Sequence, residues 1–252
     1  MDLNMRFLGP AVVVASPFIG SFICCAIDRM PNSVDVTWCR SKCDGCGTVL
    51  RAADLVPILS YLSLGGKCRS CKATISPSLL GAEIGIVLLT ASAVWFSSSH
   101  QLPIAIAFAW ILFALAAYDV AHGRLPDALT IPLCALGLGW SMLGSAPVST
   151  IGSIGGMVSG VLVSLLVATL YQLATHRSGL GGGDIKLFGA SGAWVGWQAL
   201  PTLLVLASLT ALSAAVLGGL RSRTDRLPFG PFIVVATFSI WCWQITHQRV
   251  AQ

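Results

Sequence analysis

Long apolar stretches alternate along this chain with short charged segments. Four stretches contain no Asp, Glu, Lys or Arg, and they cover residues 84–118, 128–176, 187–220 and 227–248. A helix that crosses a membrane needs about 20 apolar residues. The first three stretches are each long enough for two such helices and the last for one, and Phe7–Ile27 fits another. The pattern therefore predicts about eight transmembrane helices.

Each of the three longer stretches has a polar or turn-forming interruption near its middle. The interruptions are residues 97–103, 144–147 and, less sharply, 197–201. Ser, Gly and Pro in such runs are typical of turns between helices. The composition, with 55% hydrophobic and 10% charged residues, excludes an ordinary soluble domain. We therefore expect an all-α polytopic membrane protein.

Lysine and arginine predict the orientation of this protein in the membrane. Thirteen of the fifteen lie in four segments, which are residues 28–78, 119–127, 176–186 and 221–226. Alternating helices place all four on one side, and basic loops mark the cytoplasmic side. Anionic membrane lipid is then the expected partner for the net charge of +5, because it attracts such loops. The charge requires no nucleic-acid partner.

The expected division has three parts: a first transmembrane helix at residues 1–27, a cytoplasmic loop domain at 28–78, and a seven-helix membrane domain at 79–248. A cleaved signal peptide is the alternative for the first part. Met1–Arg6 has no net positive charge, and no clear cleavage site follows Ile27. Cleavage would also place the basic residues of 28–78 outside, so a membrane anchor is favoured.

Two pairs of cysteines mark the loop domain. They are Cys43 with Cys46 and Cys68 with Cys71, each pair separated by two residues. Two such pairs can place four thiolates around one zinc ion. A cytoplasmic loop disfavours disulfides, and a metal can close a small domain that has little apolar core. The sequence therefore predicts a structural Zn²⁺ site, with two separate redox pairs as the alternative.

Asp119 and Asp184 are the chain's main candidates for chemistry. Ionisable groups at the ends of membrane helices are expensive and often functional, and two carboxyl groups that share a proton can hydrolyse peptides. Asp127 follows Pro126 and is expected in the first turn of a helix, where a carboxylate caps free amides. We therefore assign chemistry to Asp119 and capping to Asp127.

Asp184 follows Gly181, Gly182 and Gly183, and Lys186 lies two residues further on. Glycines permit positive φ and a close approach of the backbone, so this segment is expected to present the carboxylate of Asp184 to a substrate. A plain loop is the alternative for the three glycines. Lys186 and a partner aspartate in the neighbouring cytoplasmic segment favour the functional interpretation.

Supporting roles are expected for three further features. Glu83, the only glutamate of the chain, could modulate the acidic site or pair with a basic loop residue. Arg124 lies between the two acids of the first motif and could tune their ionisation. The run Pro228–Pro231 opens the last helix, either as helix punctuation or as part of a substrate groove.

Together these motifs resemble the bacterial type IV prepilin peptidases, a family of GxGD intramembrane aspartyl proteases. The similarity runs from about Phe18 to Pro231. The matching segments are Gly20-Ser21-Phe22, Arg29-Met30-Pro31, Cys43–Ile75, Asp119–Asp127 (D-x5-L-P-D), Gly181–Lys186 (G-x-G-D-x-K) and Pro228–Pro231. Departures are Cys24 in place of asparagine, Asp44-Gly45 between the first cysteines, and no R-Y-P before Glu83. All of them lie in the amino-terminal half.

The resemblance implies an aspartic endopeptidase of the bacterial inner membrane. Asp119 and Asp184 match the two catalytic acids, with Arg124, Asp127, Gly181, Gly183 and Lys186 inside the same motifs. The implied substrates are prepilin or pseudopilin precursors, of a type IV pilus or a type II secretion system, with a basic leader before an apolar helix. The family also methylates the new N-terminus from S-adenosylmethionine, an activity associated with its amino-terminal half.

A zinc-regulated membrane transporter or sensor is the rival from another class. Intramembrane acids can couple ions as readily as they can hydrolyse peptides. Transport sites favour broken helices near the middle of the bilayer, whereas Asp119 and Asp184 are expected at the cytoplasmic boundary. Their predicted position therefore favours the peptidase.

Overall fold

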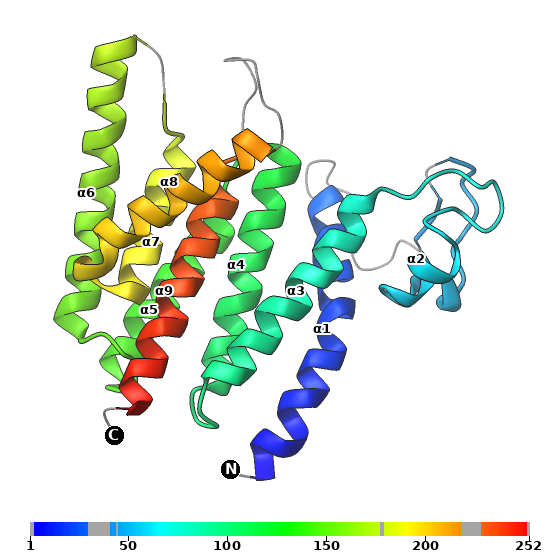
Figure 1. The fold of residues 1–252 in the computed structure, drawn as a ribbon, viewed down its shortest axis with the longest axis horizontal. Helices are drawn as coiled ribbons and strands as arrows, with labels where there is room; N and C mark the ends of the chain where they lie inside the picture. The colour runs from blue at the N-terminus through cyan, green and yellow to red at the C-terminus, as the bar shows by residue number, and fades with distance from the viewer. Residues whose placement is uncertain (1–2, 30–40, 44, 177–178, 218–227, 251–252) are drawn as a thin grey trace. The chain divides into compact units, whose positions relative to one another are not determined.

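The computed structural model describes residues 3–29, 41–43, 45–176, 179–217 and 228–250 (Figure 1). Parts of the predicted basic segments lie outside these residues, namely 30–40, 177–178 and 221–226. The described chain is helical, and two isolated bridges are the only β-type pairings in it. The predicted all-α class is confirmed.

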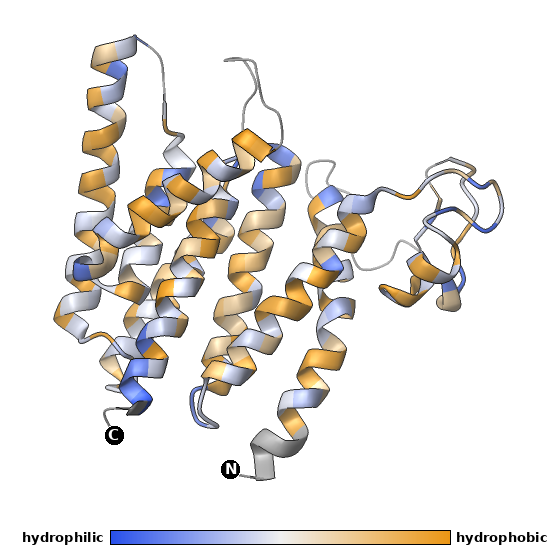
Figure 2. Ribbon diagram, in the orientation of Figure 1, coloured by the Kyte–Doolittle hydropathy of each residue, from blue (hydrophilic) through white to orange (hydrophobic). Residues whose placement is uncertain are grey.

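Eight of the described helices have 14 to 27 residues. They are α1 (Leu3–Arg29), α3 (Pro77–Phe96), α4 (Leu102–His122), α5 (Asp127–Met142), α6 (Thr150–Thr175), α7 (Gly182–Val195), α8 (Leu200–Leu217) and α9 (Gly230–Val250). Three shorter helices join them, and these are η2 (Ala52–Leu55), α2 (Leu59–Ser63) and η3 (Trp197–Ala199). In Figure 2 apolar residues dominate most of the long helices.

The predicted interruptions all fall between helices. In the first, the side chain of Gln101 closes the turn, because its Oε1 accepts from Ser98 Oγ at 2.8 Å. In the second and third, Gly144 and Gly196 adopt φ of +69° and +80°, values that other residues rarely reach. Glycine is therefore needed where these two turns reverse the chain.

Five of the described helical segments are long and apolar enough to cross a membrane. They are Leu8–Asp28, Pro77–Phe96, Leu102–His122, Thr150–Thr175 and Trp197–Leu217. Asp127–Met142 is apolar but shorter. These findings support a multi-pass membrane protein, and the figure of eight spans stays a prediction.

The chain forms two compact units, residues 1–95 and 96–252. In the first unit α1 and α3 pack through small residues. A Cβ at Gly20 would lie 2.6 Å from Ile86, and a Cβ at Gly9 would lie 2.9 Å from Val94. The two helices are therefore antiparallel neighbours. The three-part division at residues 27 and 78 stays a prediction.

An aromatic cluster forms the core of the second unit. Its members come from four helices and are Phe108, Trp140, Trp194, Phe238 and Trp241. Phe108 and Trp194 stack with ring centroids 3.9 Å apart, and the indole N–H of Trp194 donates to the Leu133 carbonyl at 2.8 Å. Buried indole N–H groups need such an acceptor, so Trp194 ties α7 firmly to α5.

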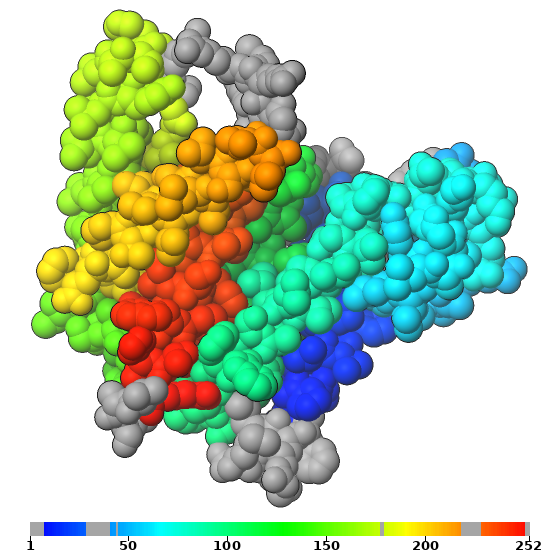
Figure 3. Space-filling model, viewed as in Figure 1, coloured from blue at the N-terminus to red at the C-terminus, as the bar shows by residue number. Residues whose placement is uncertain are grey.

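Helices α6 and α7 meet with their backbones in close contact. A Cβ at Gly156 would collide with the carbonyl of Gly192, and a Cβ at Gly160 would lie 2.7 Å from the Phe188 carbonyl oxygen. The buried hydroxyl of Ser153 donates to the carbonyl of Ala193. Small residues allow this approach between membrane helices. Figure 3 shows α8 lying beside α9 on the visible face of this unit.

Candidate active site

Asp119 lies in the last turn of α4. The helix ends at Gly123, whose φ of +61° forms a left-handed cap and whose N–H donates to the Asp119 carbonyl at 2.8 Å. The side chain of Asp119 is only 5% exposed. A carboxylate at such a position needs hydrogen-bond donors around it.

The donor to Asp119 comes from the first residue of α9. The backbone N–H of Gly230 donates to Asp119 Oδ2 at 2.9 Å. A Cβ on Gly230 would lie 2.7 Å from the same oxygen, so only glycine allows this contact without displacing the carboxylate. The run Pro228–Pro231 thus does more than begin a helix, because its glycine positions Asp119.

Gly230 is a site residue that sequence reasoning missed. It lies 111 residues from Asp119 along the chain, and no local pattern pairs the two. The available signal was Gly230 between Pro228 and Pro231 at the start of a helix. The start of a helix does not by itself require glycine there.

Asp184 is the third residue of α7 and stands in its first turn. Its Oδ2 accepts from the N–H of Gly181 at 3.2 Å. Such a carboxylate neutralises a free amide and interacts favourably with the helix dipole. The side chain is half-buried, so it can meet both the protein and a bound molecule.

Of the two properties for which glycine was expected here, the structure uses close approach and not positive φ. Gly181 is extended with φ of −74°, and the other two glycines open α7. The reason for glycine at position 183 is space, because a Cβ there would lie 2.9 Å from Leu125. Leu125 belongs to the Asp119 motif, so Gly183 brings the two motifs into contact. A Cβ at Gly182 would meet nothing within 4 Å.

Lys186 and Asp127 form a second link between these motifs. Lys186 Nζ donates to both carboxylate oxygens of Asp127, at 2.7 and 2.9 Å. Asp127 is the first residue of α5, as predicted, but the partner of both its oxygens is Lys186 rather than the helix amides. Because both side chains are more than half exposed, the pair adds little stability and mainly aligns the first turns of α5 and α7.

The two acids interact electrostatically. Burial raises the pKa of Asp184 from 3.8 to about 6, the hydrogen bond from Gly181 lowers it, and the charge of Asp119 raises it. A like charge acts in this way only when it is close. Together with the contact of Gly183 with Leu125, this interaction brings two motifs 65 residues apart in the sequence next to each other, and a site shared by the two acids stays a prediction.

Two further predicted residues lie differently. Arg124 is exposed in the turn between α4 and α5, and among the described residues it forms no ion pair with either acid. Glu83 belongs to the first unit, where it is buried and its Oε2 accepts from the backbone N–H of Ile58 at 2.7 Å. An influence of either residue on the acids stays a prediction.

The four predicted cysteines converge in the loop of the first unit. Their sulfur atoms all lie within 4.8 Å of one another, and the sulfurs of Cys43 and Cys71 are 3.8 Å apart. Tetrahedral bonds of about 2.3 Å to zinc separate two sulfurs by about 3.8 Å, so the cluster has the geometry of a metal site. All four thiols are free, and their convergence disfavours two independent redox pairs.

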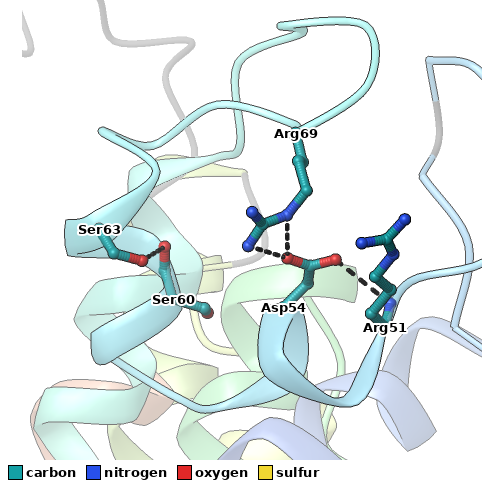
Figure 4. A network of polar contacts seen from close by, with 5 residues as sticks. All are labelled: Arg51, Asp54, Ser60, Ser63 and Arg69. Carbon is teal, nitrogen blue, oxygen red and sulfur yellow. Dashed lines mark hydrogen bonds and ion pairs between the residues drawn. The ribbon is translucent and has the colours of Figure 1, made fainter.

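A polar network supports the second cysteine pair (Figure 4). Arg69, next to Cys68, donates through Nε and Nη2 to Asp54 Oδ1, each at 2.8 Å. The N–H of Arg51 donates to the other oxygen at 3.3 Å. The hydrogen bonds from Arg69 hold the pKa of Asp54 below its usual value. A basic peptide that bound to Asp54 would therefore have to displace the side chain of Arg69.

Comparison with known proteins identifies the family. Residues 14–97 match the bacterial peptidase A24 N-terminal domain, and residues 106–216 match the type IV leader peptidase family. The prepilin leader peptidase/N-methyltransferase of Pseudomonas aeruginosa is 33% identical over 91% of this chain and 89% of its own length. The chain belongs to the type IV leader peptidase family.

Other relatives of the same name agree with this assignment. The protein from Burkholderia pseudomallei (strain 1026b) is 36% identical over 83% of this chain and 69% of its own length. The protein from Aeromonas hydrophila is 33% identical over 92% of this chain and 89% of its own length. No solved structure is significantly similar.

The family match follows the structural division. The N-terminal family domain ends at residue 97 and the first unit at residue 95, whereas the peptidase match lies wholly in the second unit. Asp119 and Asp184 both fall in the peptidase match, and the four cysteines fall in the N-terminal one. The family that the motifs predicted is confirmed, and the alternative of a transporter or sensor has no support.

The raised pKa of Asp184 predicts a pH-dependent effect of Asp184→Asn. The native carboxyl group contributes stability that is complete below its unfolded pKa and is lost as the pH rises through about 6. The variant lacks this loss. In thermal unfolding of the purified protein, the free energy of unfolding of the variant should rise relative to that of the wild type between pH 4 and pH 7.5. This relative rise should be on the order of 1 kcal/mol after allowance for solvent screening.

The difference between the two proteins at pH 4 is the internal reference for this experiment. A difference that stays constant across the pH range would mean that Asp184 ionises as freely in the fold as in the unfolded chain.

Proposed function

We propose that this protein cleaves the basic leader from prepilin-like precursors at the cytoplasmic face of the bacterial inner membrane. Asp119 and Asp184 are the catalytic pair, and water is the nucleophile. S-adenosylmethionine-dependent methylation of the new N-terminus follows, in keeping with the name shared by the relatives. The proposal rests on one observation: Asp119 and Asp184, whose charges interact, both lie inside the peptidase match.

The reaction needs one carboxylate and one carboxylic acid. The ionised member takes a proton from water as the water attacks the scissile carbonyl, and the protonated member donates to the carbonyl oxygen. Two close carboxyl groups readily share a single proton, because ionising both is unfavourable. The pair titrates as a unit, and the raised pKa of Asp184 favours retention of the shared proton to higher pH than for an ordinary aspartate.

The surrounding residues position the pair. Gly230 orients the carboxylate of Asp119, and Gly181 holds that of Asp184. Lys186 and Asp127 align the first turns that carry the two motifs. Because catalysis depends on geometry within fractions of an ångström, Gly230 and Gly181 act on the reaction through position, whereas the exposed pair of Lys186 and Asp127 contributes little.

The loop of the first unit holds a structural zinc ion on Cys43, Cys46, Cys68 and Cys71. The sulfur geometry supports this assignment. Zinc would supply the cross-link that a small domain with little apolar core requires. Since its four ligands are all protein thiolates, no open coordination position remains for catalysis.

The membrane places enzyme and substrate side by side. A precursor with an apolar helix lies in the bilayer, and its leader junction reaches the ends of α4 and α7, where the two acids are. The predicted cytoplasmic position of the basic loops agrees with a leader that is synthesised, bound and cleaved on that side of the membrane. Anionic headgroups, rather than Asp54 with its bound Arg69, are the better attraction for a basic leader.

Asp119→Asn and Asp184→Asn should each abolish cleavage of a co-expressed prepilin, because each removes one member of the shared-proton pair. The double variant should be no worse than either single variant, since groups that act as a unit are not additive. Asp127→Asn is the matched control. Loss of an exposed ion pair is worth about 0–1 kcal/mol, so the control should stay within about five-fold of the wild type.

Immunoblots of precursor and mature pilin give this readout, and equal expression and metal content show that the variants fold. Shortening of the precursor by both single variants, or an inactive Asp127→Asn with an active Asp119→Asn, would overturn the assignment of the pair.

Gly230→Ala should reduce the rate of cleavage about 100-fold, with little change in KM. The new Cβ would stand 2.7 Å from Asp119 Oδ2, so the carboxylate would have to move. A misplacement of about 1 Å at a catalytic group can lower the rate about 100-fold. Gly139→Ala is the matched control, because a Cβ there meets nothing within 4 Å. Assay of detergent-purified enzyme separates kcat from KM. Equal activity of the two variants would remove Gly230 from the site.

The purified protein should contain one zinc per chain, measured by elemental analysis. Cys68→Ser should lose it, since Cys68 is the most buried ligand, and should render the loop sensitive to protease while the membrane helices remain folded. Cys242→Ser, on α9 of the second unit, is the control and should keep its metal. Well under one zinc per chain, with four freely alkylated thiols, would count against the metal site.

A further inference from the structure

The small loop domain carries an apolar face that its own residues leave uncovered. Leu59 and Leu62 are 66% and 63% exposed, and as residues three apart in α2 they lie on the same side of that helix. Leu55 of η2 is 42% exposed and adds to this face. We call these three residues the leucine face. Large exposed side chains gathered in so short a segment mark an interaction surface.

The start of α2 is tied to a membrane helix. Ile58, which precedes α2, donates its N–H to Glu83 Oε2 at 2.7 Å. Glu83 is the seventh residue of α3, so it lies about 9 Å along that helix from Pro77 at a rise of 1.5 Å per residue. Since α3 is a candidate span, the tie holds α2 near the depth where headgroups meet acyl chains.

The backbone at this tie is unusual. Ile58 has φ of 62° and ψ of −55°, a conformation that a β-branched residue keeps only when its surroundings enforce it. The N–H of Leu59 donates to the Pro57 carbonyl at 2.6 Å and closes this turn, and Glu83 accepts from the N–H of Ile58 between them. The chain therefore turns sharply at a fixed point beside α3, and the direction of α2 is set there.

The loop that carries the leucine face has more basic than acidic residues, although its sequence also includes Asp44. The described part of the loop, residues 41–76, contains five cationic side chains, which are Lys42, Arg51, Lys67, Arg69 and Lys72. Asp54 is the one described acid in that range, and Arg69 already pairs with it. A short apolar face with basic residues around it is the pattern by which proteins bind an anionic membrane surface.

We propose that the leucine face of η2 and α2 inserts into the anionic lipid surface beside α3, with the basic residues of the loop against the headgroups. Glu83 is then a positioning residue that holds α2 at the interface. The cysteine cluster rests on the membrane rather than extending into the cytoplasm. This proposal does not depend on the peptidase assignment, because it uses residues of the first unit alone.

Photocrosslinking in the full-length protein tests this directly. The photoreactive residue p-benzoyl-phenylalanine replaces Leu62 in one variant and Leu59 in a second, and it replaces Ser70, an exposed residue between two of the cysteines, in the control. The proteins are reconstituted into vesicles of phosphatidylethanolamine and phosphatidylglycerol and irradiated. Mass spectrometry of the loop peptides then identifies what each position contacts. Metal content equal to that of the wild type shows that each variant is folded.

Lipid adducts should form at positions 59 and 62 at about five-fold or higher yield than at position 70. Their yield should fall when phosphatidylcholine replaces phosphatidylglycerol, because the basic residues then lose their partners. Glu83→Leu in the Leu62 variant leaves the N–H of Ile58 without its acceptor and should lower the yield, and an unchanged yield would mean that Glu83 does not set the depth of α2.

Other products would overturn the proposal. A covalent dimer would mean that a second copy covers the leucine face, and an adduct to residues 96–252 would mean that the second unit covers it. An adduct to an added prepilin would make it a substrate surface. Equal yields at positions 62 and 70, or no adduct at either, would mean that the face stands in water.

Discussion

The hydrogen bond from Gly230 to Asp119 is the contact on which the site depends. It joins the last turn of α4 to the first residue of α9, and it lets a carboxylate remain at 5% exposure with a donor beside it. A buried carboxyl group without a donor would be strongly unfavourable. The geometry leaves no room for a side chain at residue 230, so the two helix ends can meet only through glycine.

The second acid depends on the packing of α7. Trp194 fixes this helix against α5 through the Leu133 carbonyl, and the backbone contact at Gly156 and Gly192 fixes it against α6. Because both contacts involve the rigid body of the helix, the first turn that carries Asp184 has a defined position. Gly183 against Leu125 then brings the motif of the second acid to that of the first. Each of the two carboxyl groups thus depends on close packing between helices.

The first unit is stabilised differently, since its loop buries few of its apolar residues. The four thiols gather at one point, and the pair of Asp54 and Arg69 joins the short helix η2 to the second cysteine pair. Glu83 links the loop to α3 through a single backbone amide. Four converging cysteines that could hold a metal, one ion pair and one buried carboxylate therefore take the place that a hydrophobic core has in larger domains.

Hydropathy and turn residues determined much of the architecture by themselves. Apolar runs of the length of a bilayer can bury their backbone groups only as helices, so the all-α class and the three turns near residues 97, 144 and 197 followed from composition alone. The cysteine spacing and the two acid motifs likewise identified the metal cluster and the family, because these depend on residues close together in the chain.

Tertiary structure decided what distant residues do to one another. Asp127 was assigned to capping from its place after Pro126, yet the partner of its carboxylate is Lys186, 59 residues away. The glycines before Asp184 were expected to provide unusual dihedral angles, yet Gly183 provides space for Leu125. Gly230 had no assigned role beside Asp119. Local sequence reports a residue's own conformational preferences, whereas the identity of a partner depends on which helix ends the packing brings together.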